Sequence, residues 1–303
     1  MLCLREHLLR AQREAVAIGH FNVADLVLLK SVFAAAQELR APVLVGVSEG
    51  EREFVGVRQI AVMVRSLREE FEFPIFLNAD HTHSLEGAIA AARAGFDAIA
   101  FDRSALPFEQ NVRETASAVG SLKTVNPNIL VEGEIGDIGT GSEIHKEFAA
   151  ARRLTTPSEA KQFVDATRVD ILAPAVGNMH GLSQSMVRGE ATKRLDIVRI
   201  SEIASAVSIP LTLHGGSGTD DGDLRSAIGS GIRIVHINTE LRVAWRRGLE
   251  AALSKYPDQV VPYKILPFVI EGVKQVVSAR LQLFNGRPGA TKKEFEQAKE
   301  IYS

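Results

Sequence analysis

Three of the eight histidines in this sequence, His81, His180 and His214, lie at or just after the ends of short apolar runs. Neutral imidazoles that converge on one place bind zinc, and three of them leave a fourth coordination position open. Asp80 directly precedes His81, so a carboxylate that could move protons accompanies the first histidine. Each histidine alone is more typical of an ordinary polar residue, and the separations are too long for a local zinc motif. The set favours a metal site only if the fold brings it together.

A second group of residues suits a phosphate. The stretch His214-Gly215-Gly216-Ser217-Gly218 follows one apolar run, and Asn238-Thr239 follows the next. Glycine permits the positive φ and the close backbone approach that a phosphate cradle of N–H groups requires. By itself the glycine-rich stretch is also typical of a flexible turn, and its position along the chain favours phosphate binding.

The elements that must position these residues are eight short apolar runs, most of them continuously apolar, as in parallel strands covered on both faces. Segments of helical period lie between them: Ser84 and Gly95 should bound one helix, and Thr156-Pro157-Ser158-Glu159 should begin another as a capping box. Eight such units predict one α/β domain, a (β/α)₈ TIM barrel over residues 1–255. A doubly wound sheet is the alternative, but no G-x-G-x-x-G follows the first strand. The predicted strands span residues 16–22, 42–48, 74–80, 97–102, 128–134, 169–176, 209–214 and 231–238.

Residues 256–303 lie beyond the eighth unit. Helical period over residues 266–283 and the break at Asn285-Gly286-Arg287-Pro288-Gly289 predict a C-terminal helical extension, a hairpin packed on the barrel or on a partner subunit. In such barrels the functional groups gather at the carboxyl ends of the strands, which is where the reactive side chains of this sequence occur.

The composition excludes several classes of partner. Lys plus Arg total 35 and Asp plus Glu total 37, so there is no electrostatic reason to expect nucleic acid or an anionic membrane. No apolar run approaches the roughly 20 residues of a membrane span, and the charged N-terminal segment is unlike a signal peptide. The single cysteine, Cys3, cannot form an intramolecular disulfide. We therefore expect a cytoplasmic protein whose partner is a small molecule.

Five stretches of the sequence form a recognisable set: Asn78-Ala79-Asp80-His81, Val131-Glu132-Gly133-Glu134-Ile135-Gly136, Gly177-x-x-His180-Gly181, His214-Gly215-Gly216-Ser217-Gly218 and Thr239-Glu240-Leu241. Together they resemble the class II, zinc-dependent ketose-bisphosphate aldolases. The resemblance covers residues 5 to about 285, and the modest length is similar to the branch that includes fructose- and tagatose-bisphosphate aldolases. It implies a lyase of glycolysis or related carbohydrate metabolism, a homodimer or homotetramer, that reversibly cleaves fructose 1,6-bisphosphate to dihydroxyacetone phosphate and glyceraldehyde 3-phosphate.

The resemblance implies a role for each matching residue. His81, His180 and His214 would bind one catalytic zinc ion, with a second divalent or a monovalent cation also compatible, and Asp80 would exchange a proton with the C4 hydroxyl. Asp102 and Glu132 would contact the ligand side chains without binding the zinc, or would hold an alternative metal. The residues implied to bind the substrate and its phosphate are Asn22, Ser48, Gly181, Gly215, Ser217, His236, Asn238 and Thr239.

The chain departs from the family pattern on both sides of the predicted site. Asn78 stands where a histidine is common, two residues before the catalytic aspartate. The residues after Gly181 usually include a phosphate-binding lysine, whereas this chain has Gln184 in that stretch, which leaves Arg188 or Lys193 to compensate.

Two further departures concern groups that would touch the substrate. His236 replaces an asparagine, and the acid that would protonate the cleaved product comes one residue late, as Glu143. None of the predicted strands contains a lysine, which disfavours an imine route. The open alternatives are tagatose 1,6-bisphosphate or another ketose phosphate as substrate, an isomerase that uses Asp102 or Glu134 as a second acid/base, and a sugar-phosphate-binding barrel without catalysis.

Overall fold

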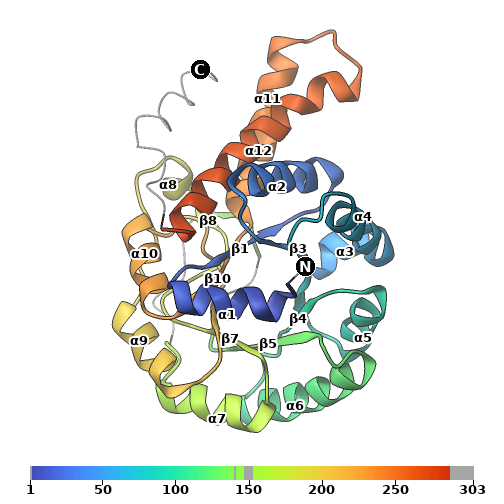
Figure 1. The fold of residues 1–303 in the computed structure, drawn as a ribbon. Coiled ribbons are helices and arrows are strands. Elements are labelled where there is room, and N and C mark those ends of the chain that lie inside the picture. The colour runs from blue at the N-terminus through green and yellow to red at the C-terminus, as the bar shows by residue number, and fades with distance from the viewer. Residues whose placement is uncertain (1, 140, 147–152, 287–303) are drawn as a thin grey trace.

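The computed structural model describes residues 2–139, 141–146 and 153–286. Eight parallel strands close into a barrel in the order β1–β2–β3–β4–β5–β7–β9–β10, with β10 paired to β1 (Figure 1). The closed barrel confirms the predicted (β/α)₈ fold and excludes the doubly wound sheet. The barrel strands are β1 Ile18–Asn22, β2 Val43–Val47, β3 Ile75–Thr82, β4 Ala98–Phe101, β5 Leu130–Ile135, β7 Ile171–Pro174, β9 Leu211–Leu213 and β10 Ile232–Ile237.

The apolar strands have two buried faces, which is why the sequence shows little alternation. In β2, Val43, Val45 and Val47 face the main core between the strands and the surrounding helices, whereas Leu44 faces the barrel interior. The interior is apolar at its amino end, where one inward residue from each barrel strand except β9 contributes to a second core. Those residues are Ile18, Leu44, Phe76, Ala98, Leu130, Ile171 and Ile234.

Helix α1 (Leu4–Glu14) closes the amino end of the barrel. Its Leu4, Leu8 and Ala11 pack on the second core, and Figure 1 shows the helix lying across the ring of strands. The helix therefore covers the amino end of the barrel and leaves the carboxyl ends of the strands at the opposite end. The other helices are α2 Leu26–Leu39, α3 Glu49–Val55, α4 Val57–Glu70, α5 Leu85–Ala94, α6 Phe108–Val125, α7 Pro157–Thr167, α8 Gln184–Val187, α9 Ile197–Ala206, α10 Asp221–Gly229, α11 Thr239–Lys255 and α12 Pro262–Phe284.

Both predicted helix starts are confirmed. Ser84 precedes α5 and its Oγ accepts a hydrogen bond from the Gly87 N–H, and α5 ends at Gly95, whose φ is +96°. Thr156 precedes α7 and forms the capping box with Glu159, whose carboxylate accepts from the Thr156 N–H at 2.9 Å. These side chains satisfy N–H groups that the first helical turn leaves without partners.

Two short strands lie outside the barrel. Strand β6 (Ile144–His145) and strand β8 (Leu182–Ser183) belong to the loops after β5 and β7 and pair in parallel with each other. The Leu182 N–H donates to the Glu143 carbonyl oxygen at 2.9 Å. This β6–β8 ribbon ties the two loops together at the carboxyl end of the barrel.

Helix α12 is the described part of the predicted extension. It packs against α11 and α2, and α11 comes so close that a Cβ at Gly248 would lie 2.9 Å from the Val269 Cα. The second arm of the predicted hairpin falls at residues 287–303, outside the described residues. Among the helices that are described, none combines the length and the apolar character needed to cross a membrane.

Candidate active site

Polar residues replace apolar ones on the inward faces of the strands as the barrel approaches its carboxyl end. Successive inward residues are two apart in a strand. A strand whose inward residue at the amino end is apolar can therefore present polar side chains nearer its carboxyl end. The inward polar residues are His20 and Asn22 on β1, Asn78 and Asp80 on β3, Glu132 and Glu134 on β5, and His236 on β10; each is at most 5% exposed.

An irregularity in β3 brings two consecutive residues to the same side. The register of β3 against β4 shifts between Ala79 and Thr82, and His81 has φ +41°. Neighbouring residues of a regular strand face opposite sides of the sheet, so the irregularity allows Asp80 and His81 both to line one pocket. A positive φ at a non-glycine residue is uncommon and occurs often at functional sites.

The three histidines predicted as metal ligands meet at this end of the barrel. His214 Nδ1 lies 3.0 Å from His81 Nε2, and the rings of His81 and His180 have their centroids 4.7 Å apart. Glu134, which was not predicted as a ligand, joins them with its Oε2 3.4 Å from His214 Nδ1. One donor atom from each of the four residues lies within 4.8 Å of all the others.

The donor atoms fit a divalent cation such as zinc. His180 Nε2 and Glu134 Oε2 are buried, and neither has a hydrogen-bond partner among the described residues. Buried polar atoms are nearly always paired, so these two atoms face a position suited to a cation. Imidazole nitrogens with a carboxylate oxygen are a usual donor set for zinc.

Two further carboxylates hold the outer nitrogens of the histidines. Asp102 Oδ2 is 2.9 Å from His81 Nδ1, and Glu132 Oε1 is 2.6 Å from His214 Nε2. Metal-binding histidines usually donate their second N–H to such a carboxylate, which fixes the ring and its tautomer. The family resemblance implied such a place for Asp102 and Glu132, or a role in holding an alternative metal, and both roles stay predictions.

The electrostatics of the cluster also favour a bound cation. Burial would lower the pKa of His81, but Asp80, Asp102 and Glu134 together raise it to about 10. Burial and the charge of Asp102 raise the pKa of Glu134 to about 7. Burial and the neighbouring His81 hold the pKa of His180 well below its usual value, so its imidazole is neutral and able to bind a metal. With no metal bound, a proton on His81 balances part of the negative charge of these carboxylates, and a cation bound by the cluster would take the place of that proton.

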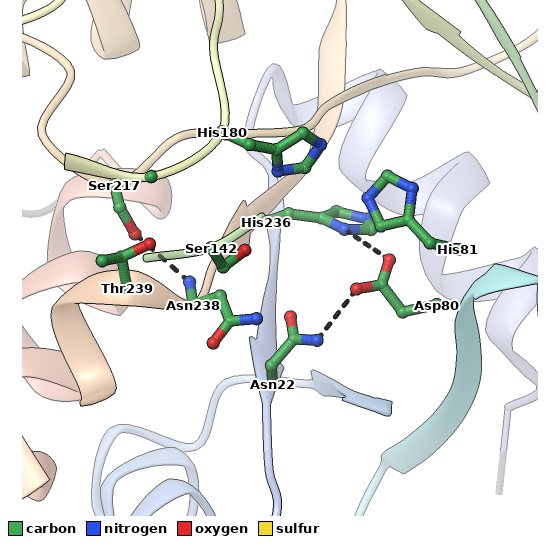
Figure 2. Close-up of a pocket in the computed structure, with 11 residues that line it drawn as sticks. Asn22, Asp80, His81, Ser142, His180, Ser217, His236, Asn238 and Thr239 are labelled. Carbon is green, nitrogen blue, oxygen red and sulfur yellow. Dashed lines mark hydrogen bonds and ion pairs between the residues drawn. The ribbon is translucent and has the colours of Figure 1, made fainter. Parts of the chain in front are cut away.

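Asp80 is held by a partner on each oxygen. Asn22 Nδ2 donates to Oδ2 at 2.8 Å, and His236 Nδ1 lies 3.3 Å from Oδ1 (Figure 2). Burial opposes ionisation, but the neighbouring His81 and His236 outweigh it and keep the pKa of Asp80 well below its ordinary value. Asp80 is therefore a carboxylate with a fixed orientation, aimed into the pocket beside the histidines.

His236 has stacked neighbours on both faces of its ring. The His20 centroid lies 3.5 Å away and the His214 centroid 3.9 Å away. The His20 ring in turn occupies space beside Gly46, where a Cβ would lie 2.0 Å from its Cε1. His20 thus contributes a buried ring to this site, which no motif in the sequence predicts.

The predicted phosphate-binding residues line the same pocket as His81 and His180: Gly181, Gly215, Ser217, Asn238 and Thr239, joined by Asn22 and His236 (Figure 2). Helix α11 begins at Thr239, and Ser217 Oγ accepts from the N–H groups of Asn238 at 3.2 Å and Glu240 at 3.4 Å. N–H groups at a helix start attract anions. At Gly215, with φ +61°, a Cβ would lie 2.3 Å from the Met179 carbonyl oxygen.

Some predicted residues do not line the pocket. Glu143 is exposed, and its neighbour Ser142 lines the pocket instead. Ser48 begins α3 and forms a capping box with Glu51. Arg188 is paired with Glu190 at the surface.

Lys193 does not line the pocket either, although it is only 2% exposed. Its Nζ donates to backbone carbonyl oxygens and is not presented for imine formation. Within the described barrel strands there is no lysine at all.

The sequence reasoning missed two buried carboxylates. Glu134 was named only as a second acid/base of an alternative isomerase, although its spacing of two from Glu132 on a strand predicts that both face the interior. Glu51 accepts hydrogen bonds from Asn22 at 2.9 Å and Arg242 at 2.8 Å, next to the pocket. Nothing in the local sequence separates Glu51 from an ordinary first-turn helix residue.

Comparison with known proteins agrees with this geometry. The family profile described as "Fructose-bisphosphate aldolase class-II" matches residues 3–287. A probable fructose-bisphosphate aldolase of Bacillus subtilis is 32% identical over 94% of this chain and 97% of its own, and a fructose-bisphosphate aldolase of Thermus caldophilus is 32% identical over 92% and 96%. The crystal structure of the YdjI aldolase from Escherichia coli K12 superposes with a TM-score of 0.77 at 29% identity, covering 94% of this chain and 97% of that one. A barrel with histidines and carboxylates gathered at its carboxyl end, matched over almost its whole length by these enzymes, places the chain in the class II fructose-bisphosphate aldolase family, as an aldolase of the carbon–carbon lyases.

Proposed function

We propose that the protein reversibly cleaves fructose 1,6-bisphosphate to dihydroxyacetone phosphate and glyceraldehyde 3-phosphate, with one zinc ion per chain held by His81, His180 and His214. The observation that carries the proposal is the position of Asp80, whose oriented carboxylate lines one pocket with His81, His180 and residues of the glycine-rich phosphate-binding segment. Glu134 would offer a fourth donor to a bound metal ion.

The chemistry needs a cation beside the substrate carbonyl and a base beside the C4 hydroxyl. A zinc ion bound by the histidines would act as a Lewis acid on the C2 carbonyl and stabilise the negative charge that develops there when the C3–C4 bond breaks. Asp80 accepts the proton of the C4 hydroxyl as that oxygen becomes the aldehyde of the leaving product. Asn22 and His236 keep the Asp80 oxygens directed at that proton.

The remaining residues fix the substrate and complete the proton balance. Amide groups of Gly181 and Gly215, with the hydroxyls of Ser217 and Thr239, bind the phosphate of the dihydroxyacetone phosphate half at the start of α11. Glu143 returns a proton to C3 from the loop that the β6–β8 ribbon anchors beside Gly181. In the net reaction, one proton leaves the C4 hydroxyl and one proton is added at C3.

The test is an enzyme-coupled assay for dihydroxyacetone phosphate, run on protein stripped by a chelator and then reloaded with zinc. Cleavage that disappears with chelation and returns with zinc supports the proposal. Tagatose 1,6-bisphosphate is the second substrate to assay, since it differs at one hydroxyl. Formation of an isomeric sugar without cleavage would identify the isomerase alternative, and sugar-phosphate binding without turnover would identify a binding barrel.

We also propose a homodimer or homotetramer that works in cytoplasmic carbohydrate metabolism such as glycolysis. Helix α12 is the surface that we assign to subunit contact, because Val260 and Tyr263 are 84% and 77% exposed at its start. Exposed large apolar side chains that lie together are a common mark of interfaces. A monomeric mass by light scattering at micromolar concentration would contradict this assignment.

A further inference from the structure

Lys193 is buried, and its ammonium group meets four main-chain carbonyl oxygens. Nζ lies 2.6 Å from the oxygens of Met179, Gly181 and Ser217, and 3.1 Å from the oxygen of Gly215. We call these four oxygens the carbonyl cage. An ammonium has three N–H donors, so the cage offers more acceptors than it can bond linearly. Converging carbonyl oxygens of this kind replace the hydration shell of a monovalent cation such as potassium.

Backbone hydrogen bonds hold Lys193 beside the glycine-rich segment, two of whose carbonyl oxygens its ammonium group contacts. Its N–H donates to the Gly218 carbonyl at 2.8 Å, its own carbonyl accepts from the Asp220 N–H at 3.1 Å, and it forms an isolated parallel bridge with Thr219. Burial lowers the pKa of Lys193 to about 7, and the charge of Glu240 opposes this effect. The fold itself thus holds the Lys193 Nζ among the four carbonyl oxygens.

The cage joins the segments that carry most of the proposed site. Met179 and Gly181 flank His180, and Gly215 directly follows His214. Gly181, Gly215 and Ser217 also line the pocket. One cation at the centre of the cage therefore fixes two loops that are separated by more than thirty residues in the sequence.

The ordinary alternative is that Lys193 only fills space in the core. An apolar side chain would do that without burying a charge, and burying a charge is costly unless polar partners surround it. Four carbonyl oxygens would repel one another if no cation lay between them. The arrangement is thus explained by the ammonium group and not by the length of the side chain.

We propose that Lys193 is a built-in monovalent cation, whose ammonium occupies a cage that could otherwise hold a free potassium or ammonium ion, and that it thereby positions His180 and the phosphate-binding segment. The occupancy of the cage stands independently of the catalytic assignment. The positioning role rests on the proposed function.

The test compares two substitutions at one position. Lys193→Ala removes the side chain and leaves the cage open to an ion, whereas Lys193→Met keeps most of the bulk and removes the charge. Lys161→Ala is the control, because Lys161 is exposed on α7 and pairs only with Asp165 among the contacts described for it. Each protein is studied in tetramethylammonium chloride, which is too large for the cage, and in potassium or ammonium chloride at the same ionic strength.

Three readouts are expected to agree. In tetramethylammonium, kcat/KM of Lys193→Ala falls about tenfold to hundredfold, the range for small misplacements of catalytic groups, and it recovers saturably with potassium or ammonium. Lys193→Met falls similarly and does not recover. Thallium-205 NMR finds one bound ion per chain in Lys193→Ala and none in the other proteins, and potassium raises the melting temperature of Lys193→Ala alone.

Several outcomes would overturn the proposal. Potassium stimulation of the unmodified enzyme, thallium binding to the unmodified protein at this site, or full activity of Lys193→Met would each do so. The first two measurements decide the matter even if Lys193→Ala does not fold. If potassium binds to and stabilises Lys193→Ala while even the unmodified, zinc-loaded protein cleaves no ketose bisphosphate, the cage assignment stands and the proposed function fails.

Discussion

Replacing Glu132 by Gln should weaken zinc binding without touching a metal ligand. The Glu132 carboxylate is 2% exposed and lies 2.6 Å from His214 Nε2, on the side of the ring away from the cluster. Its charge outweighs the effect of burial and raises the pKa of His214, so the carboxylate stabilises positive charge on this imidazole. A glutamine has nearly the same shape and can still accept the hydrogen bond, but it carries no charge.

The magnitude follows from the loss of that charge. A hydrogen bond to a charged group contributes about 1.5–3 kcal/mol and one between neutral groups about 0.5–1.5 kcal/mol. The difference of about 1–1.5 kcal/mol corresponds to a roughly tenfold weaker Kd for zinc. Outer carboxylates of metal sites have effects of about 10–100-fold, which agrees with this estimate.

The assay is competition for zinc against a chelator of known affinity, followed by kcat at saturating zinc. Asp102→Asn, which makes the equivalent change behind His81, should weaken zinc binding to a similar extent. Glu190→Gln is the matched control, because Glu190 lies at the surface. A folded Glu132→Gln protein that binds zinc as tightly as the unmodified protein would refute the reasoning that His214 is a ligand oriented through its Nε2.

Three other substitutions test separate parts of the structure. Asp80→Ala should abolish turnover while the zinc content measured by atomic absorption stays the same, and normal turnover would disprove the proton-transfer role. Gly46→Ala puts a Cβ 2.0 Å from Cε1 of His20, so we expect a loss of about 1–3 kcal/mol in the free energy of unfolding by urea. Glu240→Gln leaves Arg280 with a weaker partner and should cost about 1–3 kcal/mol at neutral pH. Burial raises the pKa of Glu240, but Arg280 outweighs it and the pKa is lowered, so this stabilisation is present above the ordinary pKa near 4.5 and is lost as the pH falls through the lower folded value.

Matched controls separate these effects from general damage. Gly120→Ala lies on α6, where a Cβ meets nothing within 4 Å, and should stabilise the protein by about 0.5–1 kcal/mol. Glu250→Gln removes an exposed ion pair from the same helix as Glu240 and should change stability by less than about 0.5 kcal/mol at any pH. If the loss of unfolding free energy in Glu240→Gln stayed the same in acid, its cause would be packing and not charge.

The barrel and the meeting of the histidines could be predicted because both depend on local patterns. Continuous apolar runs predict buried parallel strands, and a closed parallel barrel brings the ends of its strands together whatever the intervening sequence. His81, His180 and His214 therefore needed only correct strand ends to be placed side by side. The same rule applied to Glu132 and Glu134 would have predicted a second carboxylate in the cluster.

Other features depend on contacts between distant segments and have no local signal. The ring stack of His20 on His236 needs the space left by Gly46 on the adjacent strand. The pattern of residues within one strand does not predict which residues of the neighbouring strand it will contact. Lys193 lies in a polar stretch that is typical of a surface loop, yet it is almost fully buried. Its environment is made by carbonyl oxygens, which every residue carries and which no sequence pattern reveals.

The β6–β8 ribbon has a consequence for how the enzyme would discriminate among sugars. It bonds the carbonyl of Glu143 to the N–H of Leu182, immediately beside the glycine that we assign to the phosphate. Phosphate bound at Gly181 would therefore restrain the loop that carries Glu143, the proposed proton donor, so that binding energy gained at one end of the substrate would be used at the reacting carbon. A ketose without that phosphate would then be penalised more in turnover than in binding, and raising its concentration would not restore the rate.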